Sequence, residues 1–287
     1  MTEATDLTIP ARDRRPLAAT VYQARGARLV AILAGATGVR RQFYTAFAHW
    51  LADRGITVVT FDYRGTGGSL NGPVIQEAAT MRDWGTRDLA GVIDWVTGRF
   101  PGLQIVTVGH SAGGQMIALA PNANRLAAAV GIGAQSGYWG HWPRPLRYRR
   151  WLDWHVVVPG LARLFGHVPA GIFGMALPPA VARQWARWCR QPEFIGEADA
   201  FARFTRPYRF YAFTDDDFAP PAAVRALHDD YAFADRDLRM IDPVDWRVGA
   251  IGHFGFFRPG FPITAWIEVA EWLEARVSDA SRMAASA

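Results

Sequence analysis

The chain has 287 residues, of which 50% are hydrophobic and 20% are charged, so its composition excludes a disordered, collagen-like or coiled-coil protein. All 31 residues of the Lys+Arg total are arginine, which excludes chemistry that needs a lysine amine, such as a P-loop or a pyridoxal phosphate Schiff base. No apolar run reaches the roughly 18 residues of a membrane-spanning helix, and the first residues lack the features of a signal peptide. With one cysteine, Cys189, no intrachain disulfide can form, and we expect a cytoplasmic protein without a membrane span.

Short apolar runs alternate with helical patterns along the chain, which predicts a mostly parallel sheet covered by helices on both faces. Strands are expected at 7–9, 18–23, 28–33, 57–61, 104–108, 126–132, 208–213 and 238–241. Helices are expected at 43–54, 84–100, 112–120, 221–231 and 263–277.

The regular alternation stops between residues 136 and 205, where six of the twelve tryptophans lie. This predicts an α/β core formed by 1–135 and 206–287, with 136–205 inserted as a cap. One amphipathic helix is expected in the cap at 180–190, with Val181, Trp185 and Trp188 on one face. That face is expected to pack on the core. Trp185 and Trp188, together with Trp139, are also candidates for the wall of a substrate pocket.

The cap also carries the net charge. It holds nine arginines against four acidic residues, which equals the net charge of +5 of the whole chain. Because the excess is local and no nucleic-acid motif is present, we expect no nucleic-acid partner. A basic cap surface could instead contact an anionic part of a substrate or a second copy of the chain, so a homodimer through the cap is one expectation.

Residues 109–113 read Gly-His-Ser-Ala-Gly and fit the pattern G-x-S-x-G. An apolar strand precedes the pattern and a helix follows it, which is the context of a nucleophilic serine on a tight strand-to-helix turn. The flanking glycines allow the close chain approach that such a turn requires. Ser111 is therefore the candidate nucleophile, and the amide of Ala112 is a candidate donor to an oxyanion.

A serine nucleophile needs a base, and His253 is the best placed of seven histidines, in a glycine-flanked loop between the last strand and the last helix. The neighbouring His110 is expected to point away from the turn. The base needs an acid partner, which the run Asp215, Asp216 and Asp217 provides at the end of strand 208–213. An Asx turn with a helix cap is the alternative interpretation of this acidic run. The order Ser, Asp, His along the chain is that of α/β-hydrolases.

With these motifs together, the sequence resembles an α/β-hydrolase fold protein over nearly its whole length. More narrowly, it resembles a bacterial group of predicted α/β hydrolases that carry F-D-Y-R-G-x-G-G-S, G-H-S-x-G-G-Q and G-H-F-G-F-F segments, here at 61–69, 109–115 and 252–257. The resemblance implies a D-x-x-x-P pattern, which selects Asp216 as the triad acid, with Asp215 as second choice. It also implies a second oxyanion donor in the loop after strand 28–33, with Ala36 first and Thr37 next.

These residues predict a serine hydrolase that cleaves an ester or thioester of a small to medium apolar acyl substrate through an acyl-enzyme. An acyltransferase or peptidase with the same triad, and a catalytically silent binding protein on the same fold, are the alternatives. No metal-ligand spacing is present, and we expect neither a metal nor a cofactor.

Overall fold

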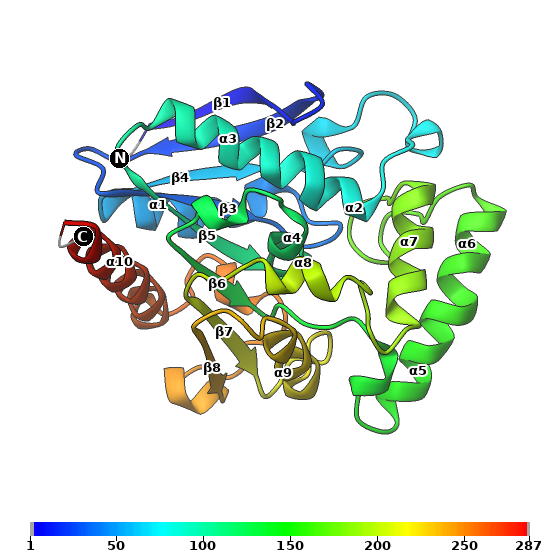
Figure 1. Ribbon diagram of the computed structural model, residues 1–287. Helices are drawn as coiled ribbons and strands as arrows, with labels where there is room; N and C mark the ends of the chain where they lie inside the picture. Colours follow the sequence, from blue (N-terminus) through cyan, green and yellow to red (C-terminus); the bar gives the residue numbers. More distant parts are fainter. Residues whose placement is uncertain (1–2, 286–287) are drawn as a thin grey trace.

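The computed structural model describes residues 3–285 and contains an eight-stranded sheet with helices on both faces (Figure 1). The strand order is β1-β2-β4-β3-β5-β6-β7-β8. β2 runs antiparallel to β1 and β4, and all other neighbours are parallel, which confirms the mostly parallel α/β sheet. The strands are β1 (Glu3–Pro10), β2 (Pro16–Gln23), β3 (Leu29–Ala34), β4 (Ile56–Phe61), β5 (Gln104–His110), β6 (Ala128–Ile132), β7 (Tyr208–Phe213) and β8 (Arg236–Ile241).

Alternate side chains of each central strand enter two separate apolar cores, because successive residues of a strand point to opposite faces. In β3, Val30 and Ile32 belong to the core on one face of the sheet, whereas Ala31 and Leu33 belong to the core on the other face. The helices of the α/β core are α1 (Thr45–Asp53), α2 (Met81–Asp83), α3 (Ala90–Arg99), α4 (Ala112–Leu119), α9 (Pro221–Asp230) and α10 (Ile263–Ala285). None of the helices in the described part of the chain is long and apolar enough to span a bilayer.

Several boundaries differ from the sequence-based expectation, and the first strand, expected at 7–9, spans Glu3–Pro10. The helix expected at 84–100 starts earlier, with α2 at Met81, and passes through a π-helical turn over Trp84–Leu89 into α3. The last helix extends beyond residue 277, to Ala285.

The cap lies at one end of the sheet, where Figure 1 shows α6 (Val158–Leu164) beside α7 (Pro179–Cys189), with α5 (Leu146–Leu152) below them and leading into α6. α7 matches the expected amphipathic helix, and α5 and α6 are additional. Trp185 of α7 packs on Trp154 and Phe173, with ring centroids 4.6 and 5.0 Å apart.

The final part of residues 136–205 packs on the α/β core rather than on α5, α6 and α7. α8 (Ala198–Ala202) contacts α4 and α9. The ring of Phe201 lies 5.0 Å from that of Tyr231, and Phe204 lies 5.8 Å from Tyr208. This segment therefore acts as the crossover from β6 to β7.

Candidate active site

Ser111 lies on the sharp turn between β5 and α4. Its backbone has φ 51° and ψ −115°, a conformation that L-residues rarely adopt and that persists only where the surroundings enforce it. The surroundings are two close backbone contacts at glycines. A Cβ on Gly109 would lie 2.4 Å from the Gly114 nitrogen, and one on Gly113 would lie 2.0 Å from the Ala34 oxygen. The strained turn and its steric cause are those that the G-x-S-x-G pattern predicts.

His253 is fixed by Asp216. Its Nδ1 lies 2.8 Å from Asp216 Oδ2, and the carboxylate is fully buried. The other oxygen, Oδ1, accepts hydrogen bonds of 2.8 Å from the amides of Phe218 and Ala219. A carboxylate can only accept here, so Nδ1 carries the proton and Nε2 is left free to accept one.

The two neighbouring aspartates do not contact the imidazole. Asp215 Oδ2 accepts hydrogen bonds from the amides of Ile251 and Gly252, at 2.7 and 3.1 Å, which anchors the loop that carries His253. Asp217 contributes its backbone oxygen, which accepts from the indole of Trp142 at 2.8 Å. The three carboxylates that the sequence left as alternatives therefore have three different environments.

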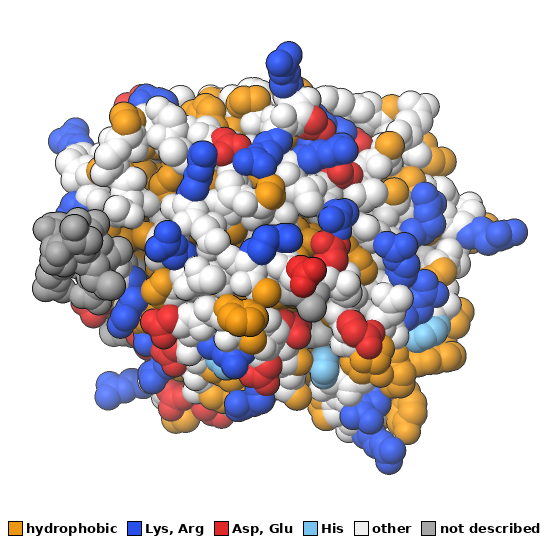
Figure 2. Space-filling view, in the orientation of Figure 1, with side chains coloured by type: hydrophobic (Ala, Val, Ile, Leu, Met, Phe, Trp, Pro, Cys, Tyr) orange, Lys and Arg blue, Asp and Glu red, His pale blue; other side chains and the backbone are white. Residues whose placement is uncertain are grey.

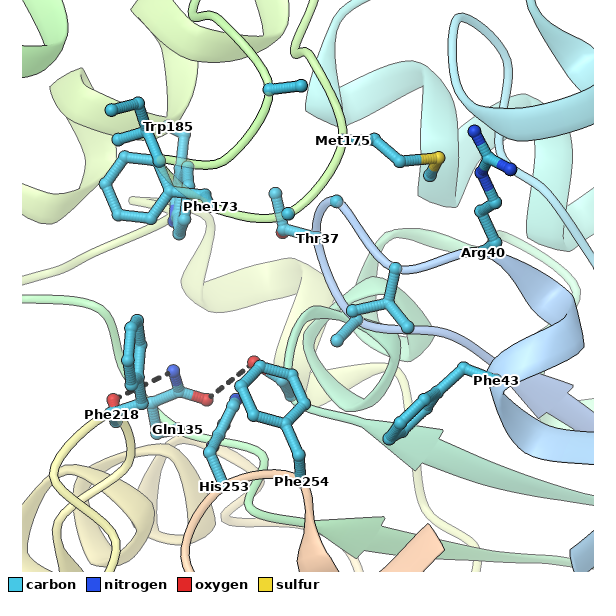
Figure 3. Close-up of a pocket in the computed structure, with 17 residues that line it drawn as sticks. Thr37, Arg40, Phe43, Gln135, Phe173, Met175, Trp185, Phe218, His253 and Phe254 are labelled. Atoms are coloured by element: carbon cyan, nitrogen blue, oxygen red, sulfur yellow. Dashed lines mark hydrogen bonds between the residues drawn. The ribbon is translucent and has the colours of Figure 1, made fainter. Parts of the chain in front are cut away.

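The Ser111 hydroxyl and the His253 imidazole line the same cavity. Within the described residues no hydrogen bond joins them. The hydroxyl instead donates to Gln135 Oε1, over a long 3.5 Å, as the dashed line in Figure 3 shows. Gln135 follows β6 and was not expected at the site. Its own side-chain amide donates to the Phe218 oxygen at 3.4 Å.

A buried polar chain connects three loops of the site through Tyr44 and His110. The His110 Nε2 lies 2.8 Å from the His253 carbonyl, which can only accept, so Nε2 carries the proton. His110 Nδ1 therefore accepts from the Tyr44 hydroxyl, at 2.9 Å, and the same hydroxyl accepts from the Ala36 amide at 2.8 Å. Burial lowers the pKa of His110 well below its ordinary value, so the ring is neutral. As expected, His110 points away from the turn.

The bond to Tyr44 revises the expectation for the oxyanion donors. The amide of Ala36, the first choice, already donates its hydrogen bond to the Tyr44 hydroxyl. The amide of Thr37, the second choice, makes no hydrogen bond within the described residues, and Thr37 lines the cavity. Ala112 is the first residue of α4, where an amide has no partner in its own helix.

The cavity above Ser111 has a volume of about 580 Å³ and is mostly apolar. Figure 3 shows Gln135, Phe218, His253 and Phe254 on one side, with Phe173 and Trp185 of the cap opposite and Arg40 at the far end. Trp185 lines the cavity as proposed from the sequence. Trp139 and Trp188 do not line it, because Trp139 packs near Tyr138 and His155, and Trp188 packs on Phe194.

The roof of the cavity touches the loop after β3 through two glycines. The Met175 amide donates to the Gly38 oxygen at 2.8 Å. A Cβ on Gly38 would lie 2.0 Å from the Phe173 oxygen, and one on Gly174 would lie 2.3 Å from the Gly38 oxygen. Both glycines also have positive φ, of 73° and 94°, so the contact depends on the absence of side chains.

No group of three or more His, Cys, Asp or Glu side chains within the described residues is arranged to hold a metal ion. The cavity is instead lined by a hydroxyl and an imidazole, with a buried carboxylate behind the imidazole, and these are the side chains of nucleophilic catalysis.

A mostly parallel eight-stranded sheet, with a strained serine after β5 and a histidine loop after β8, defines the α/β-hydrolase fold class. The family model described as serine aminopeptidase, S33, matches residues 27–170, and the chain belongs to this hydrolase family. Comparison with curated proteins gives no match.

Solved structures with the same fold include a soluble variant of monoglyceride lipase from Saccharomyces cerevisiae, with a TM-score of 0.68 and 15% identity, in which 96% of each chain is covered. An esterase from Pyrococcus furiosus has a TM-score of 0.63 and 15% identity, covering 96% of this chain and 93% of its own. A thermophilic esterase from Thermogutta terrifontis has a TM-score of 0.61 and 18% identity, covering 95% of this chain and 99% of its own.

Proposed function

We propose that the protein is a serine hydrolase that cleaves an ester or thioester of a small to medium apolar acyl group through an acyl-enzyme. The observation that carries the proposal is the Asp216–His253 hydrogen bond of 2.8 Å beside a cavity that also exposes the strained Ser111. The cavity has a volume of about 580 Å³ and a mostly apolar lining, which suits an acyl chain or an aromatic group.

In the proposed mechanism, the Ser111 hydroxyl turns from Gln135 to His253 and attacks the carbonyl carbon. Nε2 takes the proton as the Oγ–C bond forms, and the same proton passes to the leaving alcohol or thiol as its bond to carbon breaks. Asp216 holds the ring and stabilises its charged form. We assign the oxyanion to the amides of Ala112 and Thr37. Water then repeats the sequence and releases the acid.

The family description includes aminopeptidases, but the cavity favours an ester or thioester. An aminopeptidase must bind the free ammonium group of its substrate, for which a carboxylate is the natural partner. None of the described residues that line the cavity is Asp or Glu, and its far end holds the cation Arg40. The relatives named as esterase and lipase support the same choice.

The direct test is labelling with a fluorophosphonate followed by peptide mass spectrometry. We expect an adduct on Ser111, and we expect S111A to lower kcat for p-nitrophenyl butyrate by about 10⁴–10⁶-fold. S278A, a change at a serine on α10, should label and turn over like the unmodified protein. A folded protein without an adduct on Ser111 would be a binding protein, and the proposal would be wrong.

A panel of p-nitrophenyl esters, acyl-CoA thioesters and aminoacyl anilides separates the reaction types. Preferred hydrolysis of the anilides would favour a peptidase, and transfer to an added alcohol in place of water would favour an acyltransferase.

A further inference from the structure

The outer face of the cap helices is apolar although it is exposed to solvent. Residues 146–164 form one helical run, in which α5 passes through a π-helical turn into α6. The inner stripe of this run is buried, at Arg150, Trp154, Val158 and Ala162. The opposite side of the run and Phe165, which directly follows it, form what we call the cap outer face. Its apolar side chains are between 42% and 76% exposed and are Tyr148, Trp151, Leu152, Val156, Leu164 and Phe165.

This clustering exceeds ordinary surface scatter. Six of the thirteen large apolar side chains that are exposed in the described chain lie within residues 148–165. Contiguous exposed apolar surface of this kind marks an interaction site, whereas single exposed apolar residues need no explanation.

Three exposed arginines lie within or just before the helical run that carries the cap outer face. Arg144, Arg149 and Arg163 are exposed, and none forms an ion pair within the described residues. Between residues 143 and 165 the one acidic residue is Asp153. Its carboxylate pairs with the inward-facing Arg150 at 2.8 Å. In Figure 2, hydrophobic and arginine side chains gather at the lower right, over the cap.

We propose that the cap outer face docks on an anionic lipid surface, with the helical run 146–164 lying in the plane of the headgroups. A helix that binds in this way combines an apolar face with arginine at its borders and aromatic residues at the depth of the headgroups. Each exposed arginine near the surface adds to the attraction toward anionic lipid.

The charge distribution favours a lipid surface over a second copy of the chain. Two copies related by a two-fold axis would bring the same face against itself. The arginines of one copy would then meet those of the other, with no exposed acid in residues 143–165 to pair with them. A homodimer through this face would carry an electrostatic penalty, whereas phosphate headgroups complement the charge.

The cap outer face continues into the wall of the candidate active site. A cavity of about 220 Å³ is lined by Leu146 and Arg149 of the helical run and by Ile172 and Phe173. The acidic residues Asp153 and Asp217 also line it, together with Arg150. Ile172 and Phe173 also line the cavity above Ser111. Docking would therefore place the candidate active site close to the lipid surface.

Sedimentation with vesicles tests the proposal without reference to activity. We expect the protein to bind vesicles of phosphatidylcholine and phosphatidylglycerol at 3:1 and to bind pure phosphatidylcholine vesicles more weakly. We expect 0.5 M salt to weaken binding. The double variant W151E/L164E should bind at least tenfold more weakly, and R149Q/R163Q should lose most of the preference for phosphatidylglycerol.

F233E is the matched control, because Phe233 is 69% exposed and lies outside the cap. It should bind vesicles like the unmodified protein, and thermal unfolding by circular dichroism establishes that each variant folds. Equal binding by W151E/L164E and the unmodified protein would overturn the proposal. So would a dimer, measured by light scattering, that W151E/L164E converts to a monomer while the unmodified protein does not bind vesicles.

Discussion

Asp215, Asp216 and Asp217 show how three identical neighbouring side chains acquire different roles. Asp216 alone reaches the imidazole, and its second oxygen is held by two amides. Asp215 instead joins two amides of the loop before His253. The side chain of Asp217 has no hydrogen bond within the described residues, and its contribution is a carbonyl.

The different environments of the three carboxylates predict that replacing each aspartate by asparagine affects ester hydrolysis to a different degree. D216N should lower kcat by about 10⁴-fold, because an amide oriented toward Nδ1 favours the wrong tautomer of the base. D217N should leave kcat within a factor of about two, because the carbonyl that binds Trp142 remains. Equal losses in D216N and D217N, measured as steady-state rates with p-nitrophenyl butyrate, would show that Asp216 is not the partner of the base.

Among elements, the entry to α1 is coupled to the nucleophile turn and to the histidine loop by Tyr44. Its hydroxyl is the shared partner of the Ala36 amide and of His110, and His110 in turn binds the His253 carbonyl. All of these groups are buried, so each would remain unsatisfied if the hydroxyl were removed.

We therefore expect Y44F to lower the free energy of unfolding by about 2–4 kcal/mol, since it leaves a buried donor and a buried acceptor without partners. Y63F is the matched control. The Tyr63 hydroxyl is buried and has no hydrogen-bond partner among the residues that the structure describes, so its removal should leave stability unchanged or raise it. Urea unfolding of both variants measures the difference, and a similar loss in each would show that the Tyr44 hydrogen bonds contribute little.

The elements that the sequence predicts well are those whose burial leaves a regular pattern. The central strands β3, β4 and β6 are buried on both faces and read as short continuous apolar runs. α7 has one buried stripe, and the nucleophile turn follows from glycines that lie close in sequence. The run 146–164 escaped prediction because Trp154 and Val158 are buried on one face while Trp151 and Val156 are exposed on the other, which removes the periodicity.

Contacts between distant residues could not be predicted in the same way. The bond from Ala36 to Tyr44 depends on how the chain after β3 folds back, and Gln135 reaches Ser111 because β5 and β6 are neighbours. Trp185 and Trp188 are three residues apart on one helix, and only their tertiary neighbours distinguish the one that lines the cavity.

Across the whole molecule, arginines connect segments that are far apart in sequence. Buried Arg64 forms two hydrogen bonds of 2.8 Å to Asp13, in the turn between β1 and β2, and one of 2.6 Å to Asp88, at the start of the α3 region. The hydrogen bonds from Arg64 lower the pKa of Asp13 to about 2.

A carboxylate with a lowered pKa stabilises the folded state while it is ionised in both states, and this contribution is lost as the pH falls below its unfolded value. The difference in unfolding free energy between the unmodified protein and D13N should therefore be largest near pH 6 and shrink between about pH 4 and 2. Urea unfolding at several pH values measures it. D199N, at an exposed carboxylate without an ion pair in the described residues, should show no such dependence.

The roof of the cavity contacts the loop after β3 at Gly174 and Gly38, where the two backbones are in van der Waals contact. A single methyl group at either position would push the cap away from the sheet, since neither backbone has space for it. A substitution of either glycine would therefore change the shape of the cavity at Phe173 and Met175, without removing any group of the proposed reaction. The shape of the cavity thus depends on two residues that supply no group to the proposed reaction.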